Sequence, residues 1–159
     1  MKLRAAFSCG SVELDKYLKE RATQDIDRRA AAVYVLLAGN RIAGYYTLSA
    51  DNIDAKDLPE GIVTKLNLPR YPYIGATLIG RLARDLVYKG QGVGELLLVD
   101  ALQKSLYMSR NIASAAVVVD AQDEKTHQFY VDFGFIPFPD AKKKRLFLPM
   151  ATVEKTFTR

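Results

Sequence analysis

The most constraining stretch of this chain is the glycine-rich segment 81–94 (RLARDLVYKGQGVG), which leads directly into an apolar-periodic run at 95–106. The pattern predicts an extended segment, a loop and then a helix. Glycines at 90, 92 and 94 let the backbone approach a ligand closely, and the first amides of a helix have no intrahelical acceptor. Because Lys89 stands beside them and the helix dipole is positive at this end, the segment predicts a loop that binds an anion such as a pyrophosphate.

Three glycine-rich anion loops compete for this segment. A Walker loop requires Lys and then Ser or Thr after its last glycine, but Glu95 follows Gly94. The dinucleotide fingerprint Gly-x-Gly-x-x-Gly does not match glycines at alternate positions, and the chain has no room for a second βαβ half. The segment resembles motif A of the GNAT acetyltransferases (Gln/Arg-x-x-Gly-x-Gly/Ala), here KGQGVG, with Lys89 in place of the usual Gln or Arg. An ordinary turn between a strand and a helix is the remaining alternative.

Composition sets the outer limits. With 159 residues, of which 49% are hydrophobic, we expect a single domain spanning 1–159. The single Cys9 excludes an internal disulfide, and no apolar run is long enough to cross a membrane, so we expect a cytoplasmic protein with no membrane partner. A net charge of +5 is compatible with a polyanionic partner and also with ordinary solvation.

The order of predicted elements indicates an α/β fold with a mixed central sheet flanked by helices, which matches the GNAT acyl-CoA N-acyltransferase fold. Capping residues and periodicity predict helices from Ser11 to about 29, from 95 onward, and from Asp123 to Phe133 with Gly134 just beyond. Strands are expected at 31–38, 41–49, 74–86, 115–119 and 145–150, with a hairpin turn at 39–40. Residues 51–73 are expected to form a loop over the site, with a helical turn near 62–66.

Several blocks, in order along most of the chain, resemble the GNAT toxins of bacterial toxin-antitoxin pairs. They are FSCGSVELDKYL at 7–18, GYYTL at 44–48, GRLA at 80–83, VDA at 119–121, FY at 129–130 and GF at 134–135. The resemblance implies an N-acetyltransferase that moves the acetyl group of acetyl-CoA to the α-amine of an aminoacyl-tRNA and so blocks translation. It also implies a ribbon-helix-helix antitoxin as partner, with a homodimer as a candidate assembly.

The same resemblance implies the site residues. Backbone amides of the strand are expected to hold the pantetheine arm, and the loop is expected to hold the pyrophosphate. These cofactor-binding residues are Leu82, Ala83, Arg84, Lys89, Gly90, Gln91, Gly92, Val93 and Gly94. Arg84 departs from the apolar residue expected at its position.

Tyr130 matches the general acid of the family. A phenol with a pKa near ~10 can protonate a leaving thiolate whose conjugate acid has a pKa near ~8.5, and an α-amine near ~8 needs no dedicated base. The alternative is that Tyr130 is a packed aromatic. However, Phe129 and Phe133 are four apart and are expected to form the core stripe, from which Tyr130 is turned by about 100°. His127, one turn earlier, is expected to be a surface or capping residue.

The basic run Lys142, Lys143, Lys144 and Arg145 is a candidate contact for tRNA phosphates, and a solvated loop explains it equally well. Two other functions remain open. One is a GNAT acetyltransferase that acts on a small-molecule or protein amine, and the other is a non-catalytic binding module.

Overall fold

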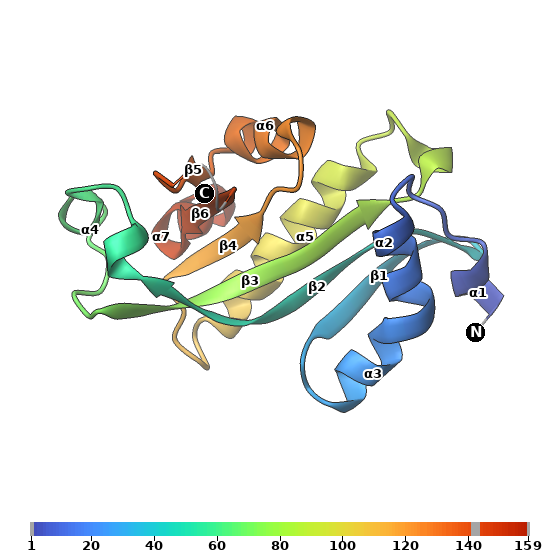
Figure 1. The fold of residues 1–159 in the computed structure, drawn as a ribbon, viewed down its shortest axis with the longest axis horizontal. Coiled ribbons are helices and arrows are strands. Elements are labelled where there is room, and N and C mark those ends of the chain that lie inside the picture. Colours follow the sequence, from blue (N-terminus) through green and yellow to red (C-terminus); the bar gives the residue numbers. More distant parts are fainter. Residues whose placement is uncertain (1, 141–143, 159) are drawn as a thin grey trace. The chain divides into compact units, whose positions relative to one another are not determined.

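The computed structural model describes residues 2–140 and 144–158. Its strands form a mixed six-stranded sheet in the order β1-β2-β3-β4-β6-β5, flanked by helices (Figure 1), so the predicted fold class is confirmed. In chain order the elements are α1 (Lys2–Ala5), α2 (Val12–Lys16), the π-helical turn η1 (Tyr17–Arg21), α3 (Ala22–Asp27), β1 (Ala32–Ala38), β2 (Arg41–Asp54), the 3₁₀ turn η2 (Ala55–Asp57), α4 (Ile62–Lys65), β3 (Tyr73–Arg84), the 3₁₀ turn η3 (Leu86–Tyr88), α5 (Val93–Met108), β4 (Ala116–Asp120), α6 (Glu124–Phe133), β5 (Ile136–Pro137), β6 (Arg145–Pro149) and α7 (Met150–Phe157).

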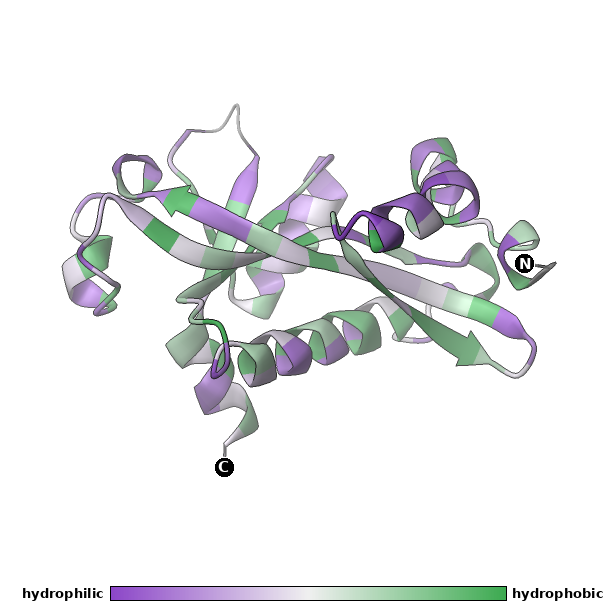
Figure 2. Ribbon diagram, turned by 90° about the horizontal axis from the view of Figure 1, so that it is seen from below, coloured by the Kyte–Doolittle hydropathy of each residue, from purple (hydrophilic) through white to green (hydrophobic). Residues whose placement is uncertain are grey.

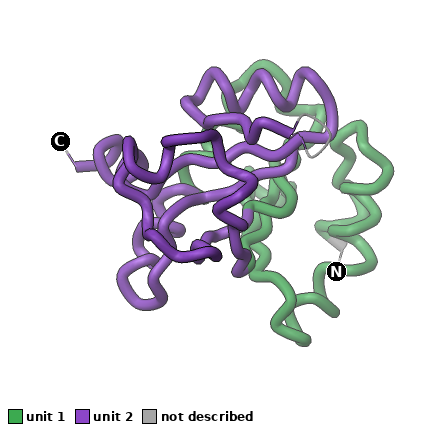
Figure 3. The backbone as a smooth tube through the Cα atoms, turned by 60° about the vertical axis from the view of Figure 1, so that its left-hand side comes forward, with its two compact units in different colours: residues 1–49, 79–101 green, residues 50–78, 102–159 purple. Residues whose placement is uncertain are grey.

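The chain divides into two compact units, which Figure 3 shows in different colours. Unit 1 comprises residues 1–49 and 79–101, and unit 2 comprises residues 50–78 and 102–159. Three elements, β2, β3 and α5, run without a break from one unit into the other.

In unit 1, the predicted N-terminal helix is present but is interrupted by η1. Ser11 caps it by accepting a hydrogen bond from the amide of Leu14. Tyr17, Leu18 and Ala22 turn their side chains into a core that also contains Phe7, Ile42, Tyr45 and Ala83. A single π-helical turn therefore does not prevent one face of this segment from packing.

The predicted hairpin is also confirmed, with β1 and β2 antiparallel and Gly39 in a left-handed conformation (φ 60°) at the turn. The predicted end of the second strand at residue 49 is wrong, because β2 continues to Asp54. The last residues of this strand are mostly polar, so the sequence pattern did not indicate a strand there. Ile53 nevertheless buries its side chain in the core of unit 2, and this burial stabilises the extended conformation. The helical turn expected near 62–66 is present as α4.

In unit 2, β4 pairs antiparallel with β6, and the short β5 pairs with the other edge of β6. The core includes Val118, Phe138 and Phe147, whose side chains are almost fully buried. The sequence patterns did not predict β5 or α7. β5 has only two residues, and α7 follows β6 directly, so neither has a long periodic pattern of its own.

The predicted α6 is confirmed with both of its caps. Asp123 accepts a hydrogen bond from the amide of Thr126, and Gly134 ends the helix with φ 109°. Along α5, hydrophilic residues are interspersed among hydrophobic ones (Figure 2), and Leu97, Leu98 and Ala101 are buried as the periodicity predicts. None of the helices among the described residues has the length and apolar character needed to span a bilayer.

Candidate active site

The glycine loop is fixed at its start by Asp85, directly after β3. The Asp85 carboxylate is 2% exposed and accepts hydrogen bonds from the amides of Ser8 (3.1 Å) and Val87 (2.9 Å). The guanidinium of Arg41 lies 3.8 Å from it. Sequence reasoning missed this residue. The Asp-x-x signature of a capped turn after an apolar strand was its only local signal.

The loop itself has the geometry of an anion site. Gly90 and Gly92 have φ of 79° and 74°, which side-chain-bearing residues rarely adopt. A Cβ built on Gly90, Gly92 or Gly94 would meet no atom within 4 Å, so the loop surface is open. The first helical bond of α5 runs from the amide of Leu96 to the carbonyl of Gly92, at 3.0 Å.

The amides of residues 92–95 have no hydrogen-bond acceptor among the described residues. Lys89 is exposed beside them and forms no ion pair within the described chain. Free amides, the positive end of a 16-residue helix and a lysine together suit a pyrophosphate, so the predicted residues fit the diphosphate of an acyl-CoA.

The strand before the loop holds Leu82, Ala83 and Arg84. The amide of Asp85 donates to the carbonyl of Ala43 on β2, at 2.8 Å. Because backbone groups alternate in direction along a strand, the amides of Leu82 and Arg84 point away from β2. Ala83 is buried, whereas Leu82 and Arg84 are half-buried. The Nη1 atom of Arg84 is buried and has no hydrogen-bond partner among the described residues.

In unit 2, Tyr130 is 5% exposed, and α6 buries it more deeply than Phe129 or Phe133, which are half-buried. The expected core stripe through those two phenylalanines is therefore wrong. Tyr130 instead lies on the inward face of α6. Its ring packs against Phe135, with 5.2 Å between the two ring centroids. Phe129 makes an edge-on contact with Tyr130 at 5.3 Å.

Burial, together with the negative charge of Asp120, raises the pKa of Tyr130 well above its ordinary value. The phenol is neutral at physiological pH, as an unperturbed tyrosine would be, and can donate a hydrogen bond, while its raised pKa makes it a weaker proton donor than an exposed tyrosine. Its hydroxyl makes no hydrogen bond within the described residues. His127 is half-buried on the preceding turn, and its backbone amide donates to the carbonyl of Asp123.

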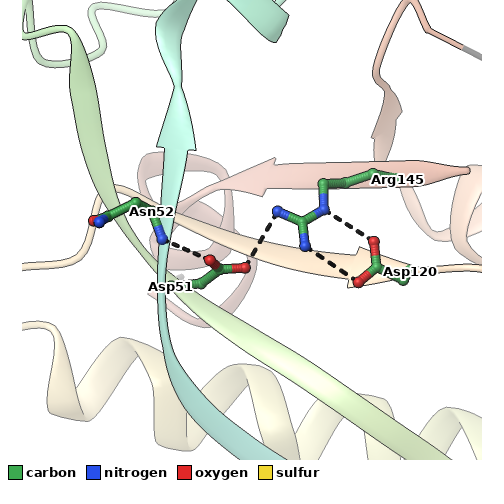
Figure 4. A network of polar contacts seen from close by, with 4 residues as sticks. All are labelled: Asp51, Asn52, Asp120 and Arg145. Carbon is green, nitrogen blue, oxygen red and sulfur yellow. Dashed lines mark hydrogen bonds and ion pairs between the residues drawn. The ribbon is translucent and has the colours of Figure 1, made fainter. Parts of the chain in front are cut away.

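Arg145 is the centre of a charged network in unit 2 (Figure 4). Its guanidinium donates two hydrogen bonds to Asp120, at 2.9 and 3.2 Å, and lies 3.2 Å from Asp51. These carboxylates raise the pKa of Arg145 further. Of the basic run, Lys142 and Lys143 lie outside the described residues, and Lys144 is exposed. Because the guanidinium of Arg145 is already paired with two carboxylates, it is poorly available to bind an RNA phosphate.

The same network borders a cavity of about 410 Å³ within unit 2. Its lining includes three carboxylates, one arginine and two aromatic side chains. The lining residues are Asn52, Ile53, Asp54, Asp57, Tyr73, Asp120, Phe138 and Arg145. A cavity of this size accommodates a small-molecule ligand or one residue of a larger one.

Comparison with curated proteins finds clear relatives, whereas no family model matches the chain. The chain is 33% identical to a probable TacT toxin of Sinorhizobium fredii, across 94% of this chain and 86% of that protein. It is 30% identical to a tRNA-acetylating toxin of Mycobacterium tuberculosis, across 82% of this chain and 76% of that protein.

Solved structures of toxins share the fold. A tyrosine-to-phenylalanine mutant of KacT superposes with a TM-score of 0.89 at 29% identity, covering 97% of this chain and 91% of KacT. AtaT in complex with acetyl-methionyl-tRNAfMet gives a TM-score of 0.88 at 28% identity, covering 98% and 92%. A mutant of AtaT bound to acetyl-CoA and to the C-terminus of the antitoxin AtaR gives 0.82 at 26% identity, covering 98% and 90%.

Proposed function

This chain belongs to the family of tRNA-acetylating toxins with the GNAT fold, and we propose that it transfers the acetyl group of acetyl-CoA to the α-amine of an aminoacyl-tRNA. The observation that carries this proposal is the loop before α5, where two glycines have left-handed φ and the four backbone amides of residues 92–95 have no acceptor among the described residues. An acetylated α-amine cannot attack a peptidyl ester, so the product blocks translation.

The glycine loop and the strand before it would bind the acetyl donor. Acetyl-CoA supplies an acetyl group activated as a thioester. Residues 89–94 would hold its diphosphate through backbone amides and the Lys89 ammonium. The amides of Leu82 and Arg84, which point away from β2, would hold the pantetheine arm and polarise the acetyl carbonyl.

Tyr130 would be the general acid that protonates the departing thiolate. In support, its phenol is protonated at physiological pH and its hydroxyl makes no hydrogen bond within the described residues, so the hydroxyl is available to a bound thiolate. The acceptor requires no dedicated general base, because an α-amine with a pKa near ~8 is already partly neutral at pH 7.

We further propose that the cavity in unit 2 receives the aminoacyl end of the tRNA, the only cationic part of this acceptor. In support, Asp54, Asp57 and Asp120 line the cavity, and the charge of Asp120 acts on Tyr130. Asp54→Asn removes one charge but can still cap η2, where Asp54 accepts a bond from the amide of Lys56. The variant should raise the KM for aminoacyl-tRNA and leave acetyl-CoA affinity unchanged. An unchanged KM would remove Asp54 from the acceptor site.

The proposed partners are tRNA and a ribbon-helix-helix antitoxin, with a homodimer as the proposed assembly and the cytoplasm as the proposed location. The exposed Lys144, with Lys142 and Lys143, is the proposed contact for tRNA phosphates, since Arg145 is paired with Asp51 and Asp120.

We also propose that residues 1–159 work as one acetyltransferase domain, because β2, β3 and α5 continue through both units.

The test is acetyl transfer from labelled acetyl-CoA to matched acceptors. Aminoacylated tRNA should be labelled, and deacylated tRNA, free amino acids, polyamines and lysine peptides should not be. Label in a small amine or a peptide instead would favour the generic acetyltransferase. A protein that binds acetyl-CoA but labels none of them would be a binding module. In cells, expression should stop growth, and co-expression of a neighbouring ribbon-helix-helix protein should restore it.

A further inference from the structure

Arg84 occupies a position where the family resemblance implies an apolar residue, and its side chain lies on a defined face of β3. The guanidinium carbon of Arg81 stacks 3.6 Å from the centre of the Tyr17 ring, and Ala83 belongs to the same core cluster as Tyr17. Ala83 is also 5% exposed. Because side chains alternate between the two faces of a strand, Leu82 and Arg84 lie on the face opposite this cluster.

That opposite face is the one covered by the first half of α5. On the neighbouring strand β2, a Cβ at Gly44 would lie 2.5 Å from Leu97, and the hydroxyl of Tyr46 donates to Asp100. Leu97 and Asp100 both belong to α5. The bond from the Asp85 amide to the Ala43 carbonyl places Arg84 opposite Gly44, and hence at the level of Leu97. The start of α5, at Val93, is only one helical turn away.

No described residue forms a hydrogen bond or an ion pair with the guanidinium of Arg84 there. Its Nη1 atom is buried without a hydrogen-bond partner, and no ion pair of Arg84 occurs among the described residues. The nearby start of α5 adds partial positive charge and free amides rather than an acceptor. A buried cationic nitrogen without a partner is costly, so a bound anion would satisfy the guanidinium and the helix amides together.

Other arginines that are partly covered have partners. Arg145 is paired with two carboxylates, Arg41 lies 3.8 Å from Asp85, and Nη1 of Arg4 donates to the carbonyl of Leu18. The Nε atoms of Arg4 and Arg41 are also buried without a hydrogen-bond partner. Arg84 differs from these two arginines in that none of its guanidinium nitrogens has a partner among the described residues, and in lying one turn from the glycine loop.

We infer that the guanidinium of Arg84 is a further ligand for the diphosphate of acetyl-CoA, supplementing the amides of the glycine loop. This inference rests on the proposed function and refines how its donor is recognised. It makes the chain more dependent on the diphosphate than a homologue with an apolar residue at this position. An RNA phosphate is the competing anion, but the free amides of α5 already select a compact anion at this end of the strand.

The experiment compares the parent with Arg84→Met, which keeps the length of the side chain and removes its charge. Calorimetry would measure affinity for acetyl-CoA and for acetylpantetheine, which lacks the diphosphate. We expect Arg84→Met to bind acetyl-CoA about tenfold to a hundredfold more weakly, the range of a charge-assisted hydrogen bond. Its affinity for acetylpantetheine should equal that of the parent.

Two further variants complete the design. Arg84→Lys should recover part of the affinity, and Arg110→Met, which removes one exposed arginine elsewhere, should behave like the parent. The midpoint temperature of thermal unfolding of Arg84→Met should equal or exceed that of the parent, because the substitution removes a partly buried charge that has no partner.

Equal weakening for both donors would show that Arg84 only supports the strand and would overturn the inference. Unchanged acetyl-CoA affinity in Arg84→Met would overturn it as well, and a raised KM for tRNA alone would assign the side chain to RNA. These outcomes leave the proposed function intact. A parent that binds acetyl-CoA but acetylates no tRNA would refute the proposed function while the effect of Arg84→Met still supported the inference. A parent without affinity for acetyl-CoA would overturn both.

Discussion

Replacing Tyr130 with phenylalanine removes one hydroxyl from a side chain that is 5% exposed and keeps its aromatic packing. The contacts with Phe129 at 5.3 Å and Phe135 at 5.2 Å involve rings alone. Since the hydroxyl makes no hydrogen bond within the described residues, the free energy of unfolding should change by less than about 1 kcal/mol. Affinity for acetyl-CoA should also be unchanged, because backbone amides and cationic side chains of unit 1 would hold the donor.

The rate of transfer should fall sharply. A positioned general acid contributes about 100-fold to 10,000-fold, which corresponds to about 2.7 to 5.4 kcal/mol of transition-state stabilisation. Phenylalanine cannot donate a proton, and a buried site offers little water to replace the phenol. The rate and the affinity should therefore separate in this variant.

Single-turnover transfer to aminoacyl-tRNA at saturating acetyl-CoA measures this loss. Tyr107→Phe is the matched control, because Tyr107 is 67% exposed on α5 and should transfer acetyl groups at the parent rate. If Tyr130→Phe keeps more than about a tenth of the parent rate, the loss is below the range of acid catalysis and Tyr130 is not the acid. If its rate falls together with its unfolding midpoint, the ring packing rather than the hydroxyl was essential.

Three other perturbations follow from local geometry. Gly92→Asp should abolish acetyl-CoA binding in calorimetry and leave the protein folded, because the new carboxylate repels the diphosphate but its Cβ meets no atom within 4 Å; parent-like binding would mean that the anion loop is misplaced. Gly44→Ala should lower the free energy of unfolding by about 1 to 3 kcal/mol in denaturant titrations, because its Cβ would lie 2.5 Å from Leu97; an unchanged midpoint would show that α5 shifts freely. Burial raises the pKa of Tyr17 to about 12 and that of Tyr46 further, so the unfolded chain loses these protons first as pH rises. The contribution of these two phenols to the free energy of unfolding should therefore be constant below about pH 10 and fall above it, and a profile that stays flat from about pH 10 to 11 would contradict their burial.

Local sequence patterns were enough to predict most of the fold. The helix of α6 could be placed from Asp123 and Gly134, because a cap and a stop are properties of a few adjacent residues. The left-handed loop before α5 could be placed from its glycines for the same reason. β2 was predicted too short because its last residues are polar, and only the burial of Ile53 in the core of unit 2 explains their extended conformation.

Some features of the candidate site could likewise be predicted from the sequence, and others depended on the tertiary structure. The sequence by itself determined the glycine-rich loop before α5 and the presence of a tyrosine on α6, since both depend on residues close together in the chain. Only the tertiary structure decided that Tyr130 is buried beside Asp120, that Arg145 is held by two carboxylates and that Arg84 is left without one. The physical reason is that burial and charge pairing depend on which groups from distant segments meet. The three partners of the Arg145 network, for example, lie on β2, β4 and β6.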